Sequence, residues 1–557
     1  MKVFWRQDQE KIGYGTAGYR GDWEKVADIV TRAYLVCAMR SASVGRPIGL
    51  MLTASHNPAK DNGIKYVDYD GNMFAVEWEQ ISNRVVNATN DELLEEIKKY
   101  PLVGSVVYIA RDTRESGVSM VEKCLAASRA LQAEEGLGEQ VLLDLGVCTT
   151  PEVHFLLREL HGQGLDNRSY PKGEELDRIR NLYFTRVERF AQIIEHIFGK
   201  EGRIQRVLDS ANGVGREKFK AIKAALRRTT DLLLLENDKD LNEECGSDYI
   251  KSKHERPAGV LSKEAEVEIK TSDGLVSGKT LICAFDGDAD RIVYLRPDTN
   301  EILDGDRLCV LFSSFLNHLL AITQETLVLT SVVTDYSNGA AMEELKSQGD
   351  LKIAATGVKN MQKEACKHPI SVWFESNGHG TIFFSNETKK YFQNKIRYRK
   401  STNILDLSET DLANEIEALL SQTTPELSGH NPDKTSPYNE TFQLLSKNEA
   451  YLLLHSLGSL FDPFIGDAIV NMCLAESIFY SQFILPTILL SLYKDLPNVL
   501  IGLTGNKELL TDVLLESIKQ KYGDLRIHLR ASGTEDIIRI YAEGPVLAQV
   551  ETAIKEI

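Results

Sequence analysis

Short apolar runs alternate along this chain with longer segments in which apolar residues recur at helical spacing. The runs predict β-strands at 106–110, 141–145, 206–209, 281–285, 327–333 and 372–374. The longer segments predict α-helices at 23–38, 121–131, 185–198, 216–225 and 308–320. Strands that alternate with helices favour α/β layers around largely buried sheets. Several of the strands end in loops rich in Gly, Asp, Asn or Ser, where the ligands of α/β sheets usually bind.

Two segments depart from this pattern. Segment 389–447 opens with an aromatic and basic run and then becomes polar and proline-containing, so we expect an insertion that is partly helical near 411–420. A solvated surface loop is the better interpretation of its basic run than a nucleic-acid site, because the whole chain is acidic. After residue 485 the pattern becomes a short α+β one and predicts a small separate C-terminal domain, with strands at 499–503, 525–529 and 537–541 and a helix at 507–522.

Length and charge limit the possible partners. The chain has 557 residues, which is too long for one hydrophobic core and predicts about three or four domains. Apolar residues make up 43% and charged residues 26%, as in ordinary soluble proteins. The net charge of −17, from 64 basic and 81 acidic side chains, argues against nucleic acid as a general partner. An anionic substrate would therefore need basic residues gathered locally.

The cysteines and the apolar stretches indicate a reducing, aqueous compartment. The eight cysteines are scattered without a Cys-x-x-Cys pair, and Cys283 and Cys309 lie in apolar runs, so we expect buried free thiols. The first residues lack the apolar core of a signal peptide. The apolar stretch 483–493 contains Pro486 and is too short to span a bilayer. We expect a cytoplasmic protein without a membrane partner.

The stretch Thr-Ala-Ser-His-Asn-Pro at 53–58 places a serine, Ser55, directly after an apolar run. A free serine is a weak nucleophile that needs a base, a metal or a reactive partner. Lys65 follows an Asn-Gly turn and could fold back beside Ser55 as a proton carrier. His56 could donate a hydrogen bond to a phosphate. Taken alone, this stretch is equally well explained as a turn without chemistry.

A second loop carries Asp286, Asp288 and Asp290 between the apolar runs 281–285 and 292–295. Alternate positions put the three carboxylates on one side of the backbone, where they can converge on a hard cation such as Mg²⁺. Crowding them without a cation would be costly, although Arg291 follows. An EF-hand is excluded because its twelfth position is Pro297. The alternative is a solvated acidic turn, which the flanking apolar strands disfavour.

Two further loops have residues suited to binding a sugar phosphate. Loop 374–380 contains Glu375, Asn377 and His379, which are groups that hydrogen-bond sugar hydroxyls, although taken alone a hairpin turn with a core histidine is the better explanation. Loop 530–536 could cradle a phosphate, although a β-turn is the alternative, through Arg530, Ser532, Gly533 and Thr534. Arg20 and Lys359 are further basic candidates, and each alone is more typical of a solvated surface charge.

Together and in this order, the four loops resemble those of the α-D-phosphohexomutase superfamily, over nearly the whole chain from Gly15 to Glu543. Within it the chain looks most like the phosphoacetylglucosamine mutase family, on the stretches 144–152, 242–249, 377–380 and 530–541. The resemblance implies a four-domain α/β enzyme, with three similar mixed α/β domains and a smaller α+β lid, each giving one loop to a central cleft. The implied domains are 1–165, 166–297, 298–485 with the insertion near 389–447, and 486–557.

The resemblance also implies a reaction, the interconversion of N-acetylglucosamine 6-phosphate and 1-phosphate through a phosphoserine and a bisphosphorylated sugar. It is an isomerase reaction of carbohydrate metabolism on the route to UDP-N-acetylglucosamine. Mg²⁺ would be held by Ser55 as phosphoserine with Asp286, Asp288 and Asp290, and glucose or N-acetylglucosamine 1,6-bisphosphate would be the activator.

The same resemblance distributes roles over the loops. Lys65 would transfer the proton, helped by His56 and Arg291. Sugar and phosphate contacts would come from Arg20, Lys359, Glu375, Asn377, His379, Arg530, Ser532, Gly533 and Thr534.

The chain departs from the family pattern at a few positions, with Ala531 in place of proline, Ser376 in place of alanine and Ser210 in place of glycine. None of these removes a chemical group that the reaction needs. Two other functions stay open, a mutase for glucose, mannose or glucosamine phosphates and a metal-dependent serine phosphatase. A distal phosphate clamp at Arg530 argues against the phosphatase, and the intact Ser55 argues against a binding protein without activity. The sequence leaves monomer and dimer open.

Overall fold

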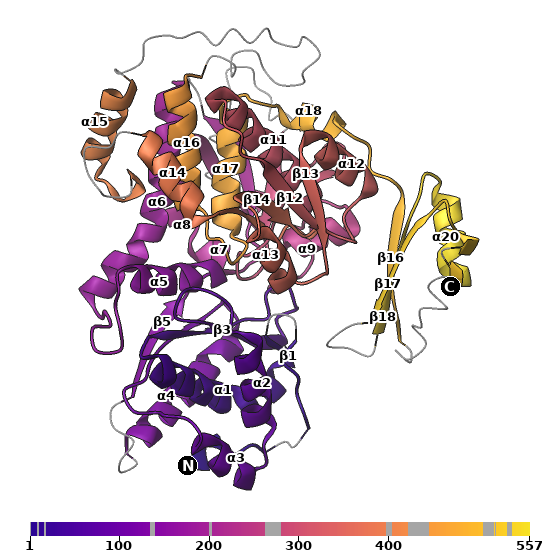
Figure 1. Cartoon of the computed structure of the whole chain (residues 1–557). Helices are drawn as coiled ribbons and strands as arrows, with labels where there is room; N and C mark the ends of the chain where they lie inside the picture. The colour runs from indigo at the N-terminus through magenta and orange to yellow at the C-terminus, as the bar shows by residue number, and fades with distance from the viewer. Residues whose placement is uncertain are drawn as a thin grey trace.

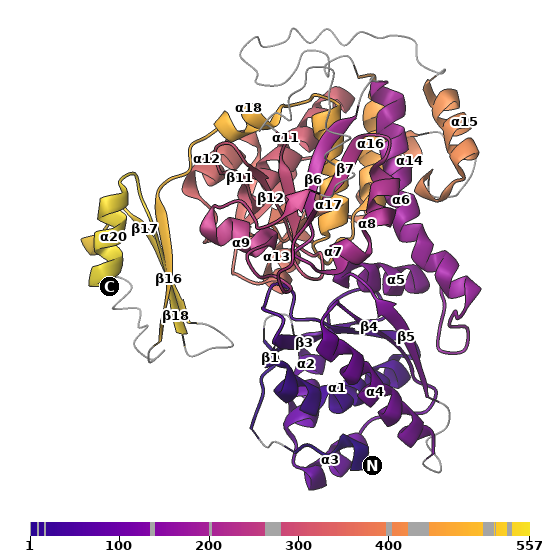
Figure 2. The same ribbon diagram turned by 180° about the vertical axis from the view of Figure 1, so that it is seen from behind.

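The computed structural model describes residues 2–7, 10–15, 18–133, 140–199, 203–261, 280–396, 404–420, 445–504, 517–518, 520–531 and 537–557. Within these residues four sheets follow one another along the chain, each with its own helices (Figure 1). The N-terminal sheet lies at one end, and the next two sheets lie together above it. The last sheet stands to one side in both views (Figures 1 and 2).

The first sheet has five strands in the order β1-β3-β2-β4-β5. Its strands are β1 (Tyr19–Asp22), β2 (Ile48–Leu52), β3 (Asp61–Val67), β4 (Val106–Arg111) and β5 (Val141–Val147). Strands β2, β4 and β5 are parallel, whereas β3 is antiparallel to β1 and β2. The accompanying helices are α1 (Trp23–Val44), α2 (Val76–Asn87), α3 (Asn90–Ile97), α4 (Glu115–Gln132) and α5 (Thr150–Gly162). The buried strand β2 leads directly to Ser55.

The second sheet has six strands in the order β11-β10-β9-β6-β7-β8. They are β6 (Ile204–Asp209), β7 (Thr230–Glu236), β8 (Val260–Leu261), β9 (Ile282–Phe285), β10 (Ile292–Arg296) and β11 (Glu301–Leu303). Its helices are α6 (Glu174–Phe198), α7 (Val214–Glu217), α8 (Phe219–Leu226) and α9 (Gly246–Lys253). Because β9 and β10 are antiparallel neighbours, the three aspartates lie in the tight turn that joins them.

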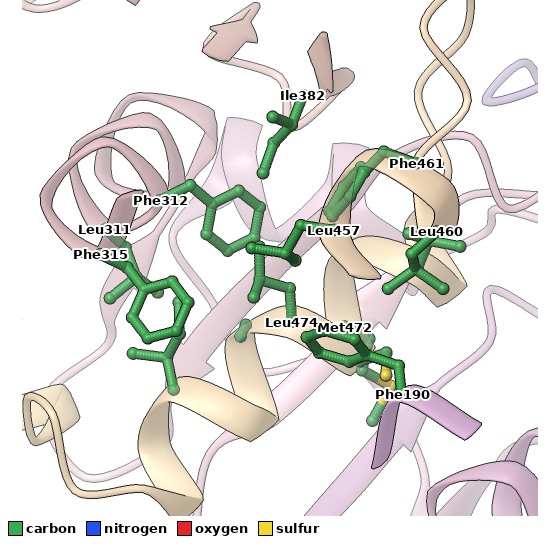
Figure 3. Packing of buried hydrophobic residues seen from close by; sticks show 14 of the residues in the cluster. Phe190, Leu311, Phe312, Phe315, Ile382, Leu457, Leu460, Phe461, Met472 and Leu474 are labelled. Carbon is green, nitrogen blue, oxygen red and sulfur yellow. The ribbon is translucent and has the colours of Figure 1, made fainter. Parts of the chain in front are cut away.

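The third sheet has four strands in the order β13-β12-β14-β15. They are β12 (Leu329–Thr334), β13 (Asp350–Ala354), β14 (Ile370–Phe374) and β15 (Gly380–Phe384). Helices follow the strands and the insertion: α11 (Gly305–Thr323), α12 (Gly339–Gln348), α13 (Val358–Ala365), α14 (Asn386–Lys395), α15 (Glu409–Leu420), α16 (Lys447–Leu460), α17 (Ala468–Tyr480) and α18 (Pro486–Ser491). Side chains from α6, α11, α16 and α17 share one core, as Figure 3 shows for Phe190, Phe312, Leu457 and Leu474. The second and third sheets therefore belong to one packed body.

The C-terminal unit consists of an antiparallel sheet, β16 (Asn498–Thr504), β18 (Ile537–Glu543) and β17 (Arg526–Ala531) in that order, and of α20 (Leu547–Glu556). Val550 and Ile554 of α20 pack on Ile538 and Ile540, which leaves the other face of the sheet turned away from the helix. The C-terminal unit therefore has a small hydrophobic core that is separate from the core of the main body.

Most of the predicted elements are confirmed. Each predicted strand overlaps a strand of the structure, and the predicted helices fall in α1, α4, α6 and α11. Segment 216–225 is two short helices, because the chain breaks at Lys218 between α7 and α8. The helix expected near 411–420 is α15, whereas most of the helix expected at 507–522 lies outside the described residues.

The expectations about thiols and membranes can also be compared with the structure. Cys283 and Cys309 are buried and unpaired as expected, and Cys366 is the exposed cysteine. Among the helices that the structure describes, none is both long and apolar enough to cross a membrane.

Candidate active site

Ser55 sits in a tight turn directly after β2, buried and with a left-handed backbone (φ 51°). Its backbone N–H donates to Thr53 Oγ1 at 2.9 Å. Its hydroxyl donates to Asp288 Oδ2 at 3.2 Å, although the two residues are 233 positions apart. The fold therefore brings the serine loop, residues 53–58, and the acidic turn, residues 286–291, together, as a shared chemistry requires.

The three aspartates form a compact cluster that suits a divalent cation. One carboxylate oxygen from each of Asp286, Asp288 and Asp290 lies within 4.8 Å of the others, and all three residues are buried. Asp286 Oδ2 and Asp288 Oδ1 accept no hydrogen bond from the described residues. Buried carboxylate oxygens without partners are costly unless a cation binds them. The donor set consists of hard oxygens, which fits Mg²⁺.

Lys65 extends from β3 into this cluster. Its Nζ lies 2.7 Å from Asp288 Oδ2 and 2.9 Å from Asp290 Oδ2. Burial opposes the charge of Lys65, but Asp288 and Asp290 outweigh it and raise the pKa, so the amine is protonated at neutral pH. Burial opposes the charge of Asp290 as well, yet Lys65 and His379 hold its pKa well below the ordinary value. For Asp286, burial and the neighbouring aspartates raise the pKa instead.

His379 links the acidic turn, residues 286–291, to loop 374–380, which is called the sugar loop after its predicted role. Its Nε2 accepts the backbone N–H of Gly466 at 3.2 Å, so the ring proton is assigned to Nδ1, which lies 3.4 Å from Asp290 Oδ1. A backbone bridge also pairs His379 with Arg291, whose Nε lies 3.9 Å from Asp286 Oδ2. With both ring nitrogens engaged, His379 is better placed to orient groups than to accept a proton.

A cavity of about 60 Å³ opens beside Ser55 and is lined from the first three sheets and their loops. The predicted residues that line it are Arg20, Ser55, Lys65, Asp290, Arg291, Glu375 and His379. Burial, together with the charges of Arg291 and Arg20, lowers the pKa of His56 well below its usual value, so this imidazole is neutral. Three cationic side chains, Arg20, Lys65 and Arg291, thus surround a space next to the serine, against the acidic charge of the chain as a whole.

The sugar loop is a hairpin turn and also a wall of the cavity. It joins β14 to β15, with the Glu375 N–H donating to the His379 carbonyl at 2.9 Å. Asn377 Nδ2 donates to Glu375 Oε2 at 3.3 Å, which orients the carboxylate. Ser376, one of the departures from the family pattern, donates to Asp306 at 2.9 Å and so ties the loop to the start of α11.

Lys359 and Arg530 lie outside the lining of this cavity. Lys359 Nζ pairs with Glu79 and donates to the Phe74 carbonyl, which joins α13 to the first sheet's helices. Arg530 is near the end of β17, close to Tyr336, where it opposes the rise in the tyrosine pKa that burial causes. Ser532, Gly533 and Thr534 lie outside the described residues, so their role stays a prediction.

Three residues to which the sequence analysis gave no role contact the serine loop and the acidic turn, although Thr150 and Asn242 lie in stretches that carry the family resemblance. Thr150 Oγ1 donates to Asp288 Oδ2 at 2.5 Å, and both Arg114 and Asn242 donate to the carbonyls of Ser55 and Asn57. A Pro-containing helix start follows Thr149, but nothing local indicates that Thr150 faces an aspartate 138 residues away. Contacts of such long range are set by the tertiary fold alone.

Three family models match parts of the chain. They are "Phosphoacetylglucosamine mutase AMG1, domain III" at 304–425, "Phosphoglucomutase/phosphomannomutase, alpha/beta/alpha domain I" at 26–92, and the phosphoglucomutase/phosphomannomutase C-terminal domain at 506–557. The phosphoacetylglucosamine mutase of Oryza sativa is 30% identical, over 96% of this chain and 92% of its own length. This chain belongs to the phosphoacetylglucosamine mutase family. The Schizosaccharomyces pombe phosphoacetylglucosamine mutase 1 is likewise 30% identical and covers 96% of both chains.

Solved structures of the phosphoacetylglucosamine mutase family share the fold over the whole chain. An N-acetylglucosamine-phosphate mutase in its substrate complex matches with a TM-score of 0.78, at 26% identity and over 100% of this chain and 97% of its own. The Aspergillus fumigatus enzyme in complex with N-acetylglucosamine 6-phosphate and magnesium matches with a TM-score of 0.75, at 28% identity, over 98% and 95% of the two chains. The expected family, fold class and enzymatic nature are confirmed.

Proposed function

We propose that this enzyme interconverts N-acetylglucosamine 6-phosphate and N-acetylglucosamine 1-phosphate, with Ser55 carrying the transferred phosphoryl group. The observation that carries the proposal is the buried Ser55 hydroxyl, 3.2 Å from Asp288 within a three-carboxylate cluster. Glu375 and His379 of the sugar loop line the same cavity. A nucleophile, a cation site and sugar-binding groups in one cavity are the parts that phosphoryl transfer to a sugar needs.

Asp286, Asp288 and Asp290 would hold Mg²⁺ together with an oxygen of the phosphorylated Ser55. When bound, the ion would offset the negative charge of the transferring phosphoryl group. The Aspergillus fumigatus relative binds magnesium, and in another form glucose 1,6-bisphosphate, which supports the same cofactor and activator for this chain.

The reaction would consist of two transfers that share one set of residues. First the O–P bond of phosphoserine breaks and a bond to the free sugar hydroxyl forms, which yields a bisphosphorylated sugar and a free Ser55 hydroxyl. Lys65 gives its proton to Ser55 Oγ and takes the hydroxyl proton of the sugar, so protons balance. The sugar then presents its other phosphate, and the reverse steps return a phosphoryl group to Ser55.

Substrate binding would divide between the two ends of the sugar. Glu375 and Asn377 would hold the hydroxyls, and His379, fixed by Gly466 and Asp290, would orient the ring. Arg20 lines the cavity and would contact the reacting phosphate with His56 and Arg291, whereas Lys359 would act through Glu79, which lines the cavity. Arg530 with Ser532, Gly533 and Thr534 would hold the distal phosphate, and this binding would supply energy for the transfer at the other end.

The proposed domains follow the sheets. The predicted boundaries at 165 and 485 fall between sheets, whereas the one at 297 falls between the paired strands β10 and β11, so the second domain would extend to Leu303. The last domain would close over the cavity and exclude water from the phosphoserine. A cytoplasmic location and a place on the route to UDP-N-acetylglucosamine complete the proposal.

The test is ³¹P NMR of the protein with N-acetylglucosamine 6-phosphate, Mg²⁺ and catalytic glucose 1,6-bisphosphate. We expect the 1-phosphate signal to grow with the natural chain and not with Ser55→Ala. Release of inorganic phosphate alone would indicate a phosphatase. Turnover of glucose 1-phosphate without any turnover of the acetamido sugar would contradict the substrate assignment.

A further inference from the structure

The backbone carbonyls of Ser55 and Asn57 accept hydrogen bonds from side chains on two sides of the serine loop. Arg114, from the first sheet's layer, donates through Nη2 to Asn57 O at 2.6 Å and to Ser55 O at 3.3 Å. Asn242, from the loop that precedes α9, donates through Nδ2 to Ser55 O at 2.8 Å and to Asn57 O at 2.9 Å. The same two carbonyls therefore receive hydrogen bonds from two separate layers of the protein.

The N–H side of Ser55 belongs to the same network. Thr53 Oγ1 accepts the Ser55 N–H at 2.9 Å and donates to Asp112 Oδ2 at 2.6 Å. Asp112 in turn pairs with Arg114, and both side chains are fully buried. The chain Asn242–Ser55–Thr53–Asp112–Arg114 thus fixes both polar backbone atoms of the serine.

The backbone of Ser55 needs this support. A serine at φ 51° is in a region that non-glycine residues rarely occupy, and such conformations persist only where the surroundings over-determine them. Gly287 of the acidic turn packs on the same carbonyl, because a Cβ there would lie 2.6 Å from Ser55 O and 3.1 Å from Asn242 Nδ2. Serine loop, acidic turn and Asn242 are therefore in mutual contact.

We propose that Asn242 and Thr53, with Arg114 and Asp112, are positioning residues that hold Ser55 Oγ against Asp288 during phosphoryl transfer. The inference rests on the proposed function, since it concerns the serine of that reaction. None of the four lines the cavity, so their loss should lower kcat and leave KM nearly unchanged. Misplacement of a reacting group by about 1 Å costs on the order of 10²-fold in rate.

The first experiment uses Asn242→Gly in the full chain. Asn242 has φ 60°, a conformation that glycine adopts without strain, so the substitution removes the amide and preserves the backbone. We expect kcat for N-acetylglucosamine 6-phosphate to fall roughly 10- to 100-fold with KM within about twofold. The matched control is Asn300→Gly, an exposed asparagine with φ 57° in the β10–β11 turn, which should keep the natural kcat.

The second experiment compares Thr53→Val with Thr53→Ser. Valine has nearly the shape of threonine but neither accepts the Ser55 N–H nor donates to Asp112, whereas serine retains both bonds. We expect Thr53→Val to lose at least about tenfold in kcat and Thr53→Ser to recover most of it. A merely structural role would instead lower the melting temperature of Thr53→Val with its kcat intact below that temperature.

The outcomes separate this inference from the proposed function. If the natural chain isomerises the sugar phosphate and both Asn242→Gly and Thr53→Val keep its kcat, the positioning role is wrong. A rise in KM with kcat unchanged would also overturn it, because the residues would then act on binding. If the natural chain shows no isomerisation at all, the proposed function itself fails.

Discussion

The serine cavity and the C-terminal unit differ in how firmly the structure holds them. Around the serine, loops from the first three sheets are buried against one another and joined by hydrogen bonds between distant residues, such as Ser55 with Asp288 and Lys65 with Asp290. The C-terminal unit, which carries Arg530, has a core of its own beside the main body (Figures 1 and 2). The serine cavity is thus already assembled within the main body, whereas the C-terminal unit is a separate unit joined to that body.

One short segment of the main body, residues 335–339, makes much of the attachment, and Arg307 adds an ion pair with Asp495 at 3.2 Å. Glu543 accepts the Gly339 N–H at 3.0 Å, and Arg526 donates to the Asp335 carbonyl at 3.0 Å. Asn338 exchanges hydrogen bonds with the backbone of Leu496, at 3.0 and 3.1 Å. Arg530 lies farther along the same strand as Arg526 and is close to Tyr336 of the same segment.

This difference explains how one site can act on a sugar that must present first one end and then the other to Ser55. The chemistry needs a serine, carboxylates and a lysine in fixed geometry, because small displacements cost much rate. The distal phosphate only has to be held, and a unit attached at one edge can move to hold it. We infer that the main body performs the transfer and that the C-terminal unit carries the anion clamp to it.

The largest expected effect is that of Asp288→Asn. The carboxylate of Asp288 accepts hydrogen bonds from Ser55, Lys65 and Thr150. The amide of asparagine would weaken all three hydrogen bonds as well as the cation site. We expect kcat/KM to fall roughly 10²- to 10³-fold, measured by coupled assay of the 1-phosphate. Asp298→Asn, an exposed residue just after β10, is the control and should keep full activity. Activity of Asp288→Asn within twofold of the natural chain would remove the cluster from the mechanism.

The next effect concerns the far end of the substrate. Under the proposed role of Arg530, its replacement by alanine would remove a charge-assisted contact to phosphate, so we expect kcat/KM to fall about 10- to 100-fold, mainly through KM. Lys521→Ala, in the same unit but paired with Glu556, should change neither parameter. An unchanged KM in Arg530→Ala would mean that the distal phosphate binds elsewhere.

A smaller effect should follow from weakening the attachment itself. Glu543 is buried and accepts hydrogen bonds from the partly exposed Arg526, from Tyr541 and from the Gly339 N–H, so Glu543→Ala removes the ion pair and leaves the Gly339 N–H unpaired. We expect the junction to lose about 1 to 2 kcal/mol and KM to rise several-fold, while the melting transition of the main body stays in place. Small-angle X-ray scattering should register a more extended particle. Glu556→Ala, on α20 far from the junction, should leave the scattering curve unchanged.

We expect the stability of the main body to depend on pH through a buried carboxyl group, that of Asp467. Burial raises the pKa of Asp467, at the start of α17, to about 7 from the model-peptide value of 3.8. The folded protein therefore keeps this proton between about pH 4 and 7 while the unfolded chain releases it. Stability is greatest at the acid end of that range and falls as pH rises, by up to about 1.4 kcal/mol per pH unit for one proton.

The check is the melting temperature measured between pH 4 and 7.5 for the natural chain and Asp467→Asn. The variant should show a shallower decline, although Asp209 and Asp306, whose pKa values burial raises to about 6, will keep part of it. Equal slopes in the two proteins would show that Asp467 is ionised in the folded state. If the melting temperature of the C-terminal unit fell more steeply with pH than that of the main body, the pH dependence would come from the C-terminal unit instead.

Much of the serine cavity was predictable from local patterns. A run of apolar residues before Ser55 and alternate aspartates at 286, 288 and 290 each have a local physical meaning, and the structure brings them together. Arg114, Thr150 and Asn242 carried no such local signal, because their contacts with the reacting loops span about 60 to 190 positions. The junction at 335–339 was equally unpredictable, since its bonds to the C-terminal unit are mostly made by backbone atoms that any residue supplies.

The most direct test of the account is the phosphorylation state of Ser55 during turnover. The enzyme would be incubated with glucose 1,6-bisphosphate and divided into two portions, one digested and analysed by mass spectrometry at once and the other only after mixing with N-acetylglucosamine 6-phosphate. We expect one phosphoryl group on the Ser55 peptide before mixing, and we expect it to disappear after mixing as a bisphosphorylated sugar forms. A phosphoryl group on another residue, or its release as inorganic phosphate without sugar product, would contradict it.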